Sequence, residues 1–306
     1  MKRFFAYAAI YLLWGASFLA IRTVVQVVPP FLAAGVRFFV AGTLLVAFSV
    51  WRRQPQPRGS QWRNLLIMAV TLFVGDYALL FWTEQKLASG IAAVTAATIP
   101  AQIFLLEWLW LRRLQPTMLS AAGLLLGLCG VIALVLPSGF WSGHGTLNHY
   151  AAVGLLAASC WAFGTVLSTR LALPQARAVS AGWQMLFGGV ALLSLSLVTG
   201  EVRDIRLSAL RAPQWFSMGY LIVFASLIAF SAFVYLLQHE PARRVASYAY
   251  VNPVVALLLG FWIGGESFTL HQGLACAVII AGVLVTLIGR SVPLSVTRVD
   301  PPKRHT

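Results

Sequence analysis

The chain has 306 residues, of which 59% are hydrophobic and 10% charged, and its formal net charge is +14. A soluble helical protein would show amphipathic stripes with charged outer faces, and the long, uniformly apolar runs of this chain exclude that class. The same runs are too long for the alternating strands of an outer-membrane barrel. The composition therefore predicts an all-α membrane protein.

Ten apolar segments follow one another along the chain, each bounded by basic or turn-forming residues. A hydrocarbon core about 30 Å thick takes about 20 residues of helix, and backbone groups in lipid must be satisfied within their own segment. The first run is longer than the apolar part of a signal peptide, so we interpret it as a retained helix. The predicted membrane helices are Phe4–Val25, Phe31–Trp51, Asn64–Thr83, Ile91–Leu111, Met118–Leu136, Ala151–Leu171, Ala178–Val198, Trp215–Gln238, Val245–Ile263 and Gln272–Gly289.

The basic residues are unevenly divided between the two sides that these segments define. With the N-terminus in the cytoplasm, sixteen fall on the cytoplasmic side: Lys2, Arg3, Arg52, Arg53, Arg58, Arg63, Arg112, Arg113, Arg170, Arg177, Arg243, Arg244, Arg290, Arg298, Lys303 and Arg304. Five fall on the other side: Arg22, Lys86, Arg203, Arg206 and Arg211. This positive-inside bias predicts that both termini are cytoplasmic. Anionic lipid head groups explain the basic excess, so no nucleic-acid partner is expected.

An uncharged stretch of loop composition at residues 137–146 divides the segments into two sets of five. Sliding the second set onto the first by 153 residues places Pro253 on Pro100. Because each set has an odd number of helices, the two sets must run in opposite orientations, and such inverted-topology repeats are typical of secondary transporters. We expect a first repeat at 1–139, a connecting loop at 140–150, a second repeat at 151–290 and a disordered cytoplasmic tail at 291–306.

Several short motifs resemble those of one membrane-protein family. They are Tyr11-Leu12-Leu13-Trp14-Gly15-Ala16-Ser17-Phe18, Pro29-Pro30, Gly35-Val36-Arg37-Phe38, Ser89-Gly90-Ile91-Ala92-Ala93, Trp161-Ala162-Phe163-Gly164, Ser247-Tyr248-Ala249-Tyr250-Val251-Asn252-Pro253-Val254-Val255-Ala256 and Gly265-Glu266. With these motifs the chain resembles EamA-type members of the drug/metabolite transporter superfamily over essentially its whole length to about residue 290. The resemblance implies ten helices in a five-plus-five inverted repeat and the export of small metabolites or drugs.

Aromatic and polar side chains deep inside the apolar segments are the candidates for a solute site. Aromatic residues of an interface belt would lie at segment ends, whereas these lie several turns inside. Aromatic faces with a few polar tips suit planar or cationic solutes, although helix packing would also account for any one of them. The candidate cavity residues are Trp14, Ser17, Asp76, Tyr77, Thr95, Thr98, Trp161, Ser226, Tyr248, Tyr250 and Asn252.

Asp76 and two prolines are the most specific of the mechanistic candidates. Asp76 lies near the bilayer centre, where an ionisable group is costly unless paired or hydrated and usually faces a transport pathway. It is predicted to exchange protons or bind a substrate amine; a structural aspartate is the alternative. Pro100 and Pro253 are predicted in mid-helix, where each would free a carbonyl and kink the helix, either as part of a gate or as a structural kink.

Three further charged residues could serve in coupling or at an outer mouth. Arg37 is predicted two turns from the outer side, so that its stem snorkels to the interface or its guanidinium pairs with Glu84 or Asp76. Glu84 and Glu266 are expected on the outer side, in a cation-favouring mouth or simply solvated. No phosphate-binding loop is found and the histidines lack metal spacing, so neither cofactor nor metal is expected.

Taken together, the sequence predicts a multi-pass carrier of the bacterial inner (plasma) membrane and not an enzyme. It would export small organic solutes, such as amino acids and aromatic or cationic compounds, by alternating access through a midplane cavity between the repeats. Transport would be proton-coupled or facilitative, and the carrier a monomer or homodimer among membrane lipids. The alternative is a flippase, or an accessory subunit, for a lipid-linked precursor.

Overall fold

The computed structural model describes residues 1–112, 114–115, 117–135, 149–205, 207–267, 269–289 and 292–293. The predicted connecting loop lies outside the described residues except for 149–150, and the predicted tail does so except for 292–293.

The described part of the first half is almost entirely helical and contains one π-helix. Its elements are α1 (Lys2–Val25), α2 (Pro30–Trp51), α3 (Ser60–Ala69), the π-helix η1 (Val70–Ala78), α4 (Leu79–Thr83), α5 (Ser89–Ala96), α6 (Ile99–Leu109) and α7 (Met118–Val135). The helices α3, η1 and α4 run without interruption as one helical segment, Ser60–Thr83.

The second half repeats this pattern, again with a π-helix in its third long segment. Its elements are α8 (His149–Ser168), α9 (Arg177–Val198), two short 3-10 helices (Glu201–Asp204 and Leu207–Ala209), α10 (Ala212–Tyr220), the π-helix η5 (Leu221–Phe230), α11 (Ser231–Leu237), α12 (Ala242–Val245), α13 (Tyr248–Trp262) and α14 (Leu270–Ile288). Two-residue strands, β1 (Leu114–Gln115) and β2 (Val292–Pro293), pair antiparallel.

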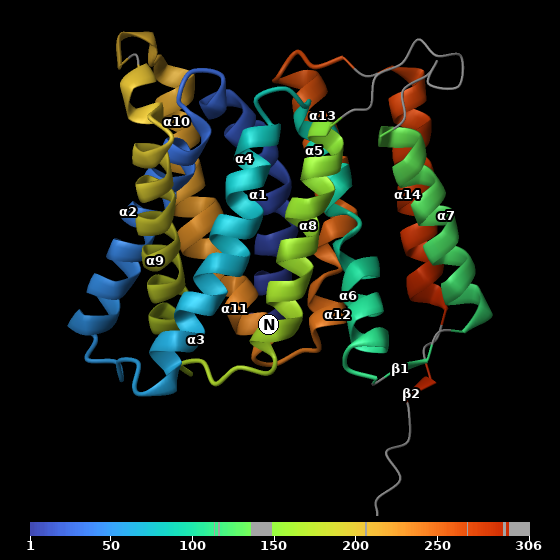
Figure 1. The fold of residues 1–306 in the computed structure, drawn as a ribbon, viewed down its shortest axis with the longest axis horizontal. Helices are drawn as coiled ribbons and strands as arrows, with labels where there is room; N and C mark the ends of the chain where they lie inside the picture. The colour runs from blue at the N-terminus through green and yellow to red at the C-terminus, as the bar shows by residue number, and fades with distance from the viewer. Residues whose placement is uncertain are drawn as a thin grey trace, which may run out of the picture.

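Each predicted apolar segment coincides with a helical segment, which confirms the all-α membrane class. In the described part of the chain, seven segments are long and apolar enough to cross a membrane, and three shorter apolar helices accompany them. The helices stand side by side with their long axes roughly parallel (Figure 1). The N-terminus, the start of α3 and the end of α6 lie at one end, here called the lower end; the end of α1 and the starts of α5 and α10 lie at the upper end.

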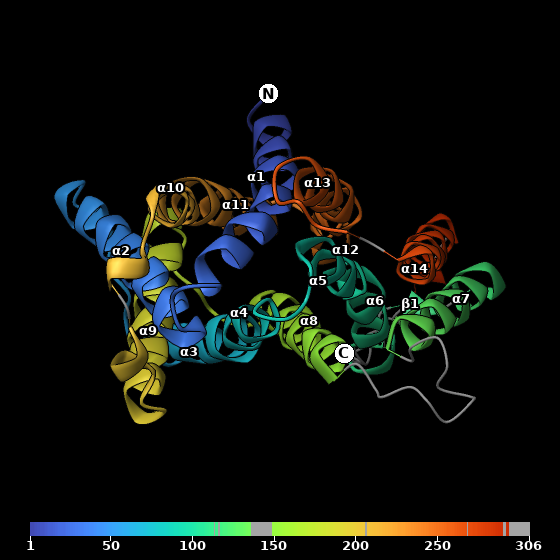
Figure 2. The ribbon, with the colours of Figure 1, turned by 90° about the horizontal axis from the view of Figure 1, so that it is seen from above.

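Seen from above, the bundle has a central group of helices flanked by two pairs (Figure 2). The pair α2–α9 lies at one edge and the pair α7–α14 at the other, and both pairs are in extensive contact. Glycines permit this close approach: a Cβ at Gly42 would lie 2.4 Å from the backbone nitrogen of Leu186, and one at Gly282 would lie 2.2 Å from that of Gly127. Close backbone packing at small residues is the usual means of association in lipid.

The central group is built from contacts that cross between the halves. The helix α1 packs on α13 and η5, whereas α8 packs on α5, α6 and η1. If the halves are superimposed in order, α1 corresponds to α8, α13 to α5–α6, and η5 to η1. The two sets of contacts are thus equivalent, and they surround the same central space.

The prolines differ from their predicted positions in one respect. Pro253 lies inside α13, as expected. Pro100 does not lie in mid-helix, because the segment is interrupted at Ala97 and Thr98 and Pro100 is the second residue of α6. In the first turn of a helix the missing N–H of proline costs no hydrogen bond. The break in this segment therefore precedes Pro100.

Candidate functional site

A small cavity of ≈ 50 Å³ lies at the centre of the bundle, with walls from both halves of the chain. Its lining residues are Trp14, Ser17, Phe18, Asp76, Tyr77, Leu80, Thr95, Ala96, Ile99, Gly154, Ala157, Ala158, Trp161, Tyr248 and Asn252. Eight of these belong to the predicted set: Trp14, Ser17, Asp76, Tyr77, Thr95, Trp161, Tyr248 and Asn252. A water molecule needs roughly 10–15 Å³ of such space, so the cavity has room for only a few waters.

Four aromatic side chains form the framework of this cavity. The ring centroid of Trp14 lies 5.5 Å from that of Trp161 and 4.9 Å from that of Tyr248, and Tyr77 lies 5.7 Å from Trp161. All three contacts are edge-to-face, an arrangement that aromatic rings prefer. The rings come from α1, η1, α8 and α13, so they tie together helices that are far apart in sequence.

Three hydrogen bonds to backbone carbonyls hold the side chains that line this cavity. The Trp14 Nε1–H donates to the carbonyl of Ala225 in η5, at 2.9 Å. The Asn252 amide nitrogen, oriented toward its acceptors, donates to the carbonyls of Tyr11 at 2.9 Å and Tyr248 at 3.2 Å, so that α13 is linked to α1. By contrast, Trp161 Nε1 is buried without an acceptor among the described residues.

Asp76 is the acid of the cavity wall. It lies in η1, is 7% exposed, and lines the cavity beside Tyr77. No hydrogen bond or ion pair within the described part of the chain engages its carboxylate; Arg37 acts on it electrostatically from beyond ion-pair distance. π-Helical segments occur frequently at functional sites, and here the π-helix η1 contains both the acid and an aromatic wall residue.

Arg37 does not snorkel to the interface as predicted, because its side chain is fully buried. Its guanidinium carbon lies 4.5 Å from the ring centroid of Phe38, 5.0 Å from that of Tyr77 and 5.9 Å from that of Phe81. Such cation–π contacts stabilise a desolvated cation. Its Nε–H donates to Ser226 Oγ at 2.9 Å, whereas Nη1 and Nη2 have no partner among the described residues. Tyr77 thus separates Arg37 from the cavity.

Neither of the predicted outer acids is simply solvated at the upper end, because the Glu266 side chain is 7% exposed and Glu84 is fully buried. Glu266 pairs with Arg22 (Nε to Oε1, 3.2 Å) and accepts hydrogen bonds from the backbone and side chain of Ser89, the first residue of α5. The Arg22 guanidinium also donates to the carbonyls of Glu84 and Leu87. Glu84 itself is fully buried, and both carboxylate oxygens lack a partner in the described part of the chain.

Three predicted cavity residues lie elsewhere. Thr98 is in the break between α5 and α6 and hydrogen-bonds to Thr95 and Gln102. Ser226 holds Arg37, and Tyr250 packs in a separate apolar cluster near Leu87. The sequence reasoning also missed the small residues of α8 that line the cavity. Their spacing is the signal that could have identified them: Gly154, Ala157 and Ala158 recur at helical intervals on one face.

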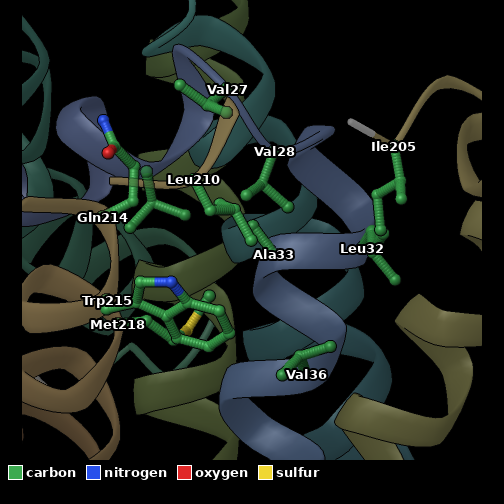
Figure 3. A pocket seen from close by; sticks show the side chains of 11 residues that line it. Val27, Val28, Leu32, Ala33, Val36, Ile205, Leu210, Gln214, Trp215 and Met218 are labelled. Atoms are coloured by element: carbon green, nitrogen blue, oxygen red, sulfur yellow. The ribbon is translucent and has the colours of Figure 1, made fainter. Parts of the chain in front are cut away.

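Two other hollows flank the bundle. One of ≈ 450 Å³ lies among α3, α9, α11 and the α8–α9 connection. The other, of ≈ 150 Å³, lies near the upper end between α1, α2 and α10 (Figure 3). Figure 3 shows that Gln214 is the polar member of an otherwise apolar wall that includes Trp215 and Met218. This second hollow therefore offers little to orient a polar solute.

Apolar helices around a small cavity with one acid and several polar tips define a polytopic membrane protein with a polar site inside its helix bundle. A model of the EamA-like transporter family matches residues 4–136 and 149–288. The chain therefore belongs to the EamA-like transporter family, and the resemblance inferred from its motifs is confirmed.

Individual relatives agree with this assignment. The uncharacterized inner membrane transporter YedA of Escherichia coli (strain K12) is 37% identical over 290 residues, which cover 94% of this chain and 91% of YedA. The WAT1-related protein At3g02690, chloroplastic, of Arabidopsis thaliana is 26% identical over 278 residues, covering 88% and 66%. A protein of known crystal structure, 22% identical, shares the fold with a TM-score of 0.65 over 94% of this chain and 98% of its own. The family consists of transporters rather than enzymes.

Proposed function

We propose that this protein is an inner-membrane secondary transporter that exports small organic solutes through the central cavity. The observation that carries the proposal is the cavity itself, where Asp76 meets aromatic rings from both halves of the chain. The likeness to YedA, which is named as an inner membrane transporter, supports the location. Aromatic walls and a single acid favour amino acids and aromatic or cationic compounds as cargo.

The proposed topology has ten membrane helices in two oppositely oriented sets of five, with both termini in the cytoplasm. The equivalent contacts made by α1 and α8 support the repeat, as does the division of the family match into two ranges. The excess of basic residues at the lower end supports the orientation. Alternating access would then rock one set of helices against the other around the cavity.

Asp76 is the proposed coupling or amine-binding residue of this carrier. Arg37, Tyr77, Cys160 and Tyr248 are the titratable or charged groups that interact with it electrostatically. If Asp76 exchanges a proton during the cycle, transport depends on pH; if it only binds a substrate amine, transport is facilitative.

The test is solute counterflow in proteoliposomes at two pH values, with candidate solutes first selected by thermal shift. The wild-type protein is expected to exchange labelled solute, and Asp76→Asn to lose either exchange or its pH dependence. Glu201→Gln is the matched control, because Glu201 accepts a hydrogen bond from the backbone of Leu32 outside the cavity. Unaltered, pH-dependent exchange by Asp76→Asn would remove the coupling role.

A lipid flippase is the second candidate, and the apolar hollow of Figure 3 favours it because acyl chains prefer such walls. The same proteoliposomes separate the two functions if they contain a fluorescent lipid. Lipid scrambling or flipping without solute exchange would refute the proposed carrier function and support the flippase function.

A further inference from the structure

The ≈ 450 Å³ hollow and the central cavity share an aromatic partition. The hollow, here called the vestibule, lies toward the lower end, since it includes Gln61 at the start of α3 and Gln238 just after α11. Met68 and Leu72 line it from α3 and η1, and Asp76, one turn further along the same segment, lines the central cavity. The two spaces therefore follow one another along a single helical segment.

Phe233 occupies the boundary between these spaces. It lines the vestibule, is 1% exposed, and its ring centroid lies 5.2 Å from Trp14, 5.2 Å from Trp161 and 6.2 Å from Tyr248. Those three residues line the central cavity. Phe230, which also lines the vestibule, supports Phe233 at 6.0 Å. One layer of aromatic rings thus lies between the two spaces.

The vestibule differs from the partition in chemistry. Its polar lining residues are uncharged: Gln61, Ser168, Thr169, Gln175, Ser180, Gln184 and Gln238. Side-chain amides and hydroxyls can both donate and accept hydrogen bonds. These groups can bind a polar solute at the entrance through hydrogen bonds, without an ion pair.

The upper end of the central cavity is closed by different means. The helix α1, the start of α5 and the segment after α13 are joined there by the contacts of Arg22, Ser89 and Glu266. Breaking that junction would require loss of an ion pair and two hydrogen bonds. The partition between the vestibule and the central cavity, by contrast, consists of aromatic rings. The ion pair between Arg3 and Glu240 at the lower end lies outside the lining of the vestibule.

We propose that the vestibule is the solute entrance at the lower end and that the Phe233 ring is the gate between it and the central cavity. The inference rests on the proposed carrier function and deepens it. Phe233 is the third residue of α11, the helix that directly follows the π-helix η5. A shift of this irregular turn would rotate Phe233 relative to Trp14 and Trp161 and so open the partition.

The test measures access to the central cavity and needs no known solute. Ser17 lines the cavity and is 6% exposed, so Ser17→Cys places a reporter thiol there in a background with Cys129, Cys160 and Cys276 replaced by alanine. A membrane-impermeant thiol reagent is applied from the lower side in vesicles of one orientation and from the upper side in vesicles of the other. Phe233→Ala is expected to accelerate labelling from the lower side by about tenfold or more and to leave labelling from the upper side unchanged.

Phe73→Ala is the matched control, because Phe73 is equally buried and packs on Phe230 but lines neither space. Equal acceleration by Phe73→Ala, no acceleration by Phe233→Ala, or acceleration only from the upper side would each overturn the gate. Phe233→Leu serves if Phe233→Ala does not fold. Labelling of the reporter thiol does not depend on the transported solute. A failed counterflow assay would therefore refute the proposed carrier function, whereas the labelling rates would still decide whether Phe233 is the gate.

Discussion

Arg22 and Glu266 lie 244 positions apart in the sequence and form an ion pair of 3.2 Å at the upper end of the bundle. Glu266 also accepts two hydrogen bonds from Ser89 at the N-terminus of α5. A carboxylate in that position is favoured both by the free N–H groups and by the helix dipole. One acid from the second half of the chain therefore holds two helices of the first half.

Removal of this acid is expected to destabilise the protein. Glu266→Ala leaves the Arg22 guanidinium and the Ser89 donors without their acceptor, which should cost about 2 kcal/mol for charge-assisted hydrogen bonds. Glu266→Gln keeps an acceptor for Ser89 and should cost less. Thermal unfolding in detergent measures both, and a double-mutant cycle with Arg22→Ala should be non-additive. Strict additivity would mean that the ion pair contributes nothing.

Substitution of Arg37 should separate stability from transport. No carboxylate lies within ion-pair distance of its buried guanidinium in the described part of the chain, and apolar residues often replace buried ionic groups without loss of stability. Arg37→Met is therefore expected to keep or raise the unfolding temperature but to reduce solute exchange. Arg37→Lys should lower the unfolding temperature, because an ammonium cannot reproduce the planar stacking on Phe38 and Tyr77. Full exchange by Arg37→Met would show that transport does not need this charge.

Close packing of α2 on α9 makes a specific prediction for Gly42. A methyl group there would meet the backbone of Leu186 at 2.4 Å, so Gly42→Ala must push the helices apart and should cost about 1–3 kcal/mol. Gly219→Ala is the control, since nothing lies within 4 Å of its added methyl group and alanine has the higher helix propensity. Unfolding temperatures should fall for the first variant and hold or rise for the second.

The two tryptophans of the cavity should respond differently to phenylalanine. Trp14→Phe loses the hydrogen bond to Ala225 and should cost about 1 kcal/mol of stability. Trp161→Phe loses no hydrogen bond in the described structure, so its effect on stability should be smaller. If the Trp161 Nε1–H binds solute, Trp161→Phe will instead weaken solute-induced thermal shifts. If Trp14→Phe and Trp161→Phe had equal effects on stability and on solute-induced thermal shifts, this division of roles would be contradicted.

The depth of the site within the membrane was predictable from the sequence. Helical rise is 1.5 Å per residue, so counting along an apolar segment places Trp14, Asp76 and Trp161 several turns inside it. A charged or aromatic residue at that depth is unusual enough to be noticed. The structure does place these three residues around one cavity.

The direction in which each side chain points was not predictable in the same way. Thr98, Ser226 and Tyr250 do not line the central cavity and face other partners, because the rotation of a nearly uniform apolar helix is set by its neighbours. Apolar residues surround such a helix on all sides, so the sequence does not indicate which face points toward the cavity. The burial of Arg37 likewise depends on rings contributed by Phe38, Tyr77 and Phe81.

The sequence by itself determined that this chain is a bundle of membrane helices, that its basic residues gather on one side, and that it belongs to the EamA-like transporter family. Apolar length, charge distribution and short motifs are local properties, and a linear chain displays them directly. Only the tertiary structure decided that η1 and η5 are π-helical, that Glu266 caps α5, and that Phe233 separates two spaces. Those features arise from contacts between residues far apart in sequence, where the energy of packing, and not local pattern, selects the arrangement.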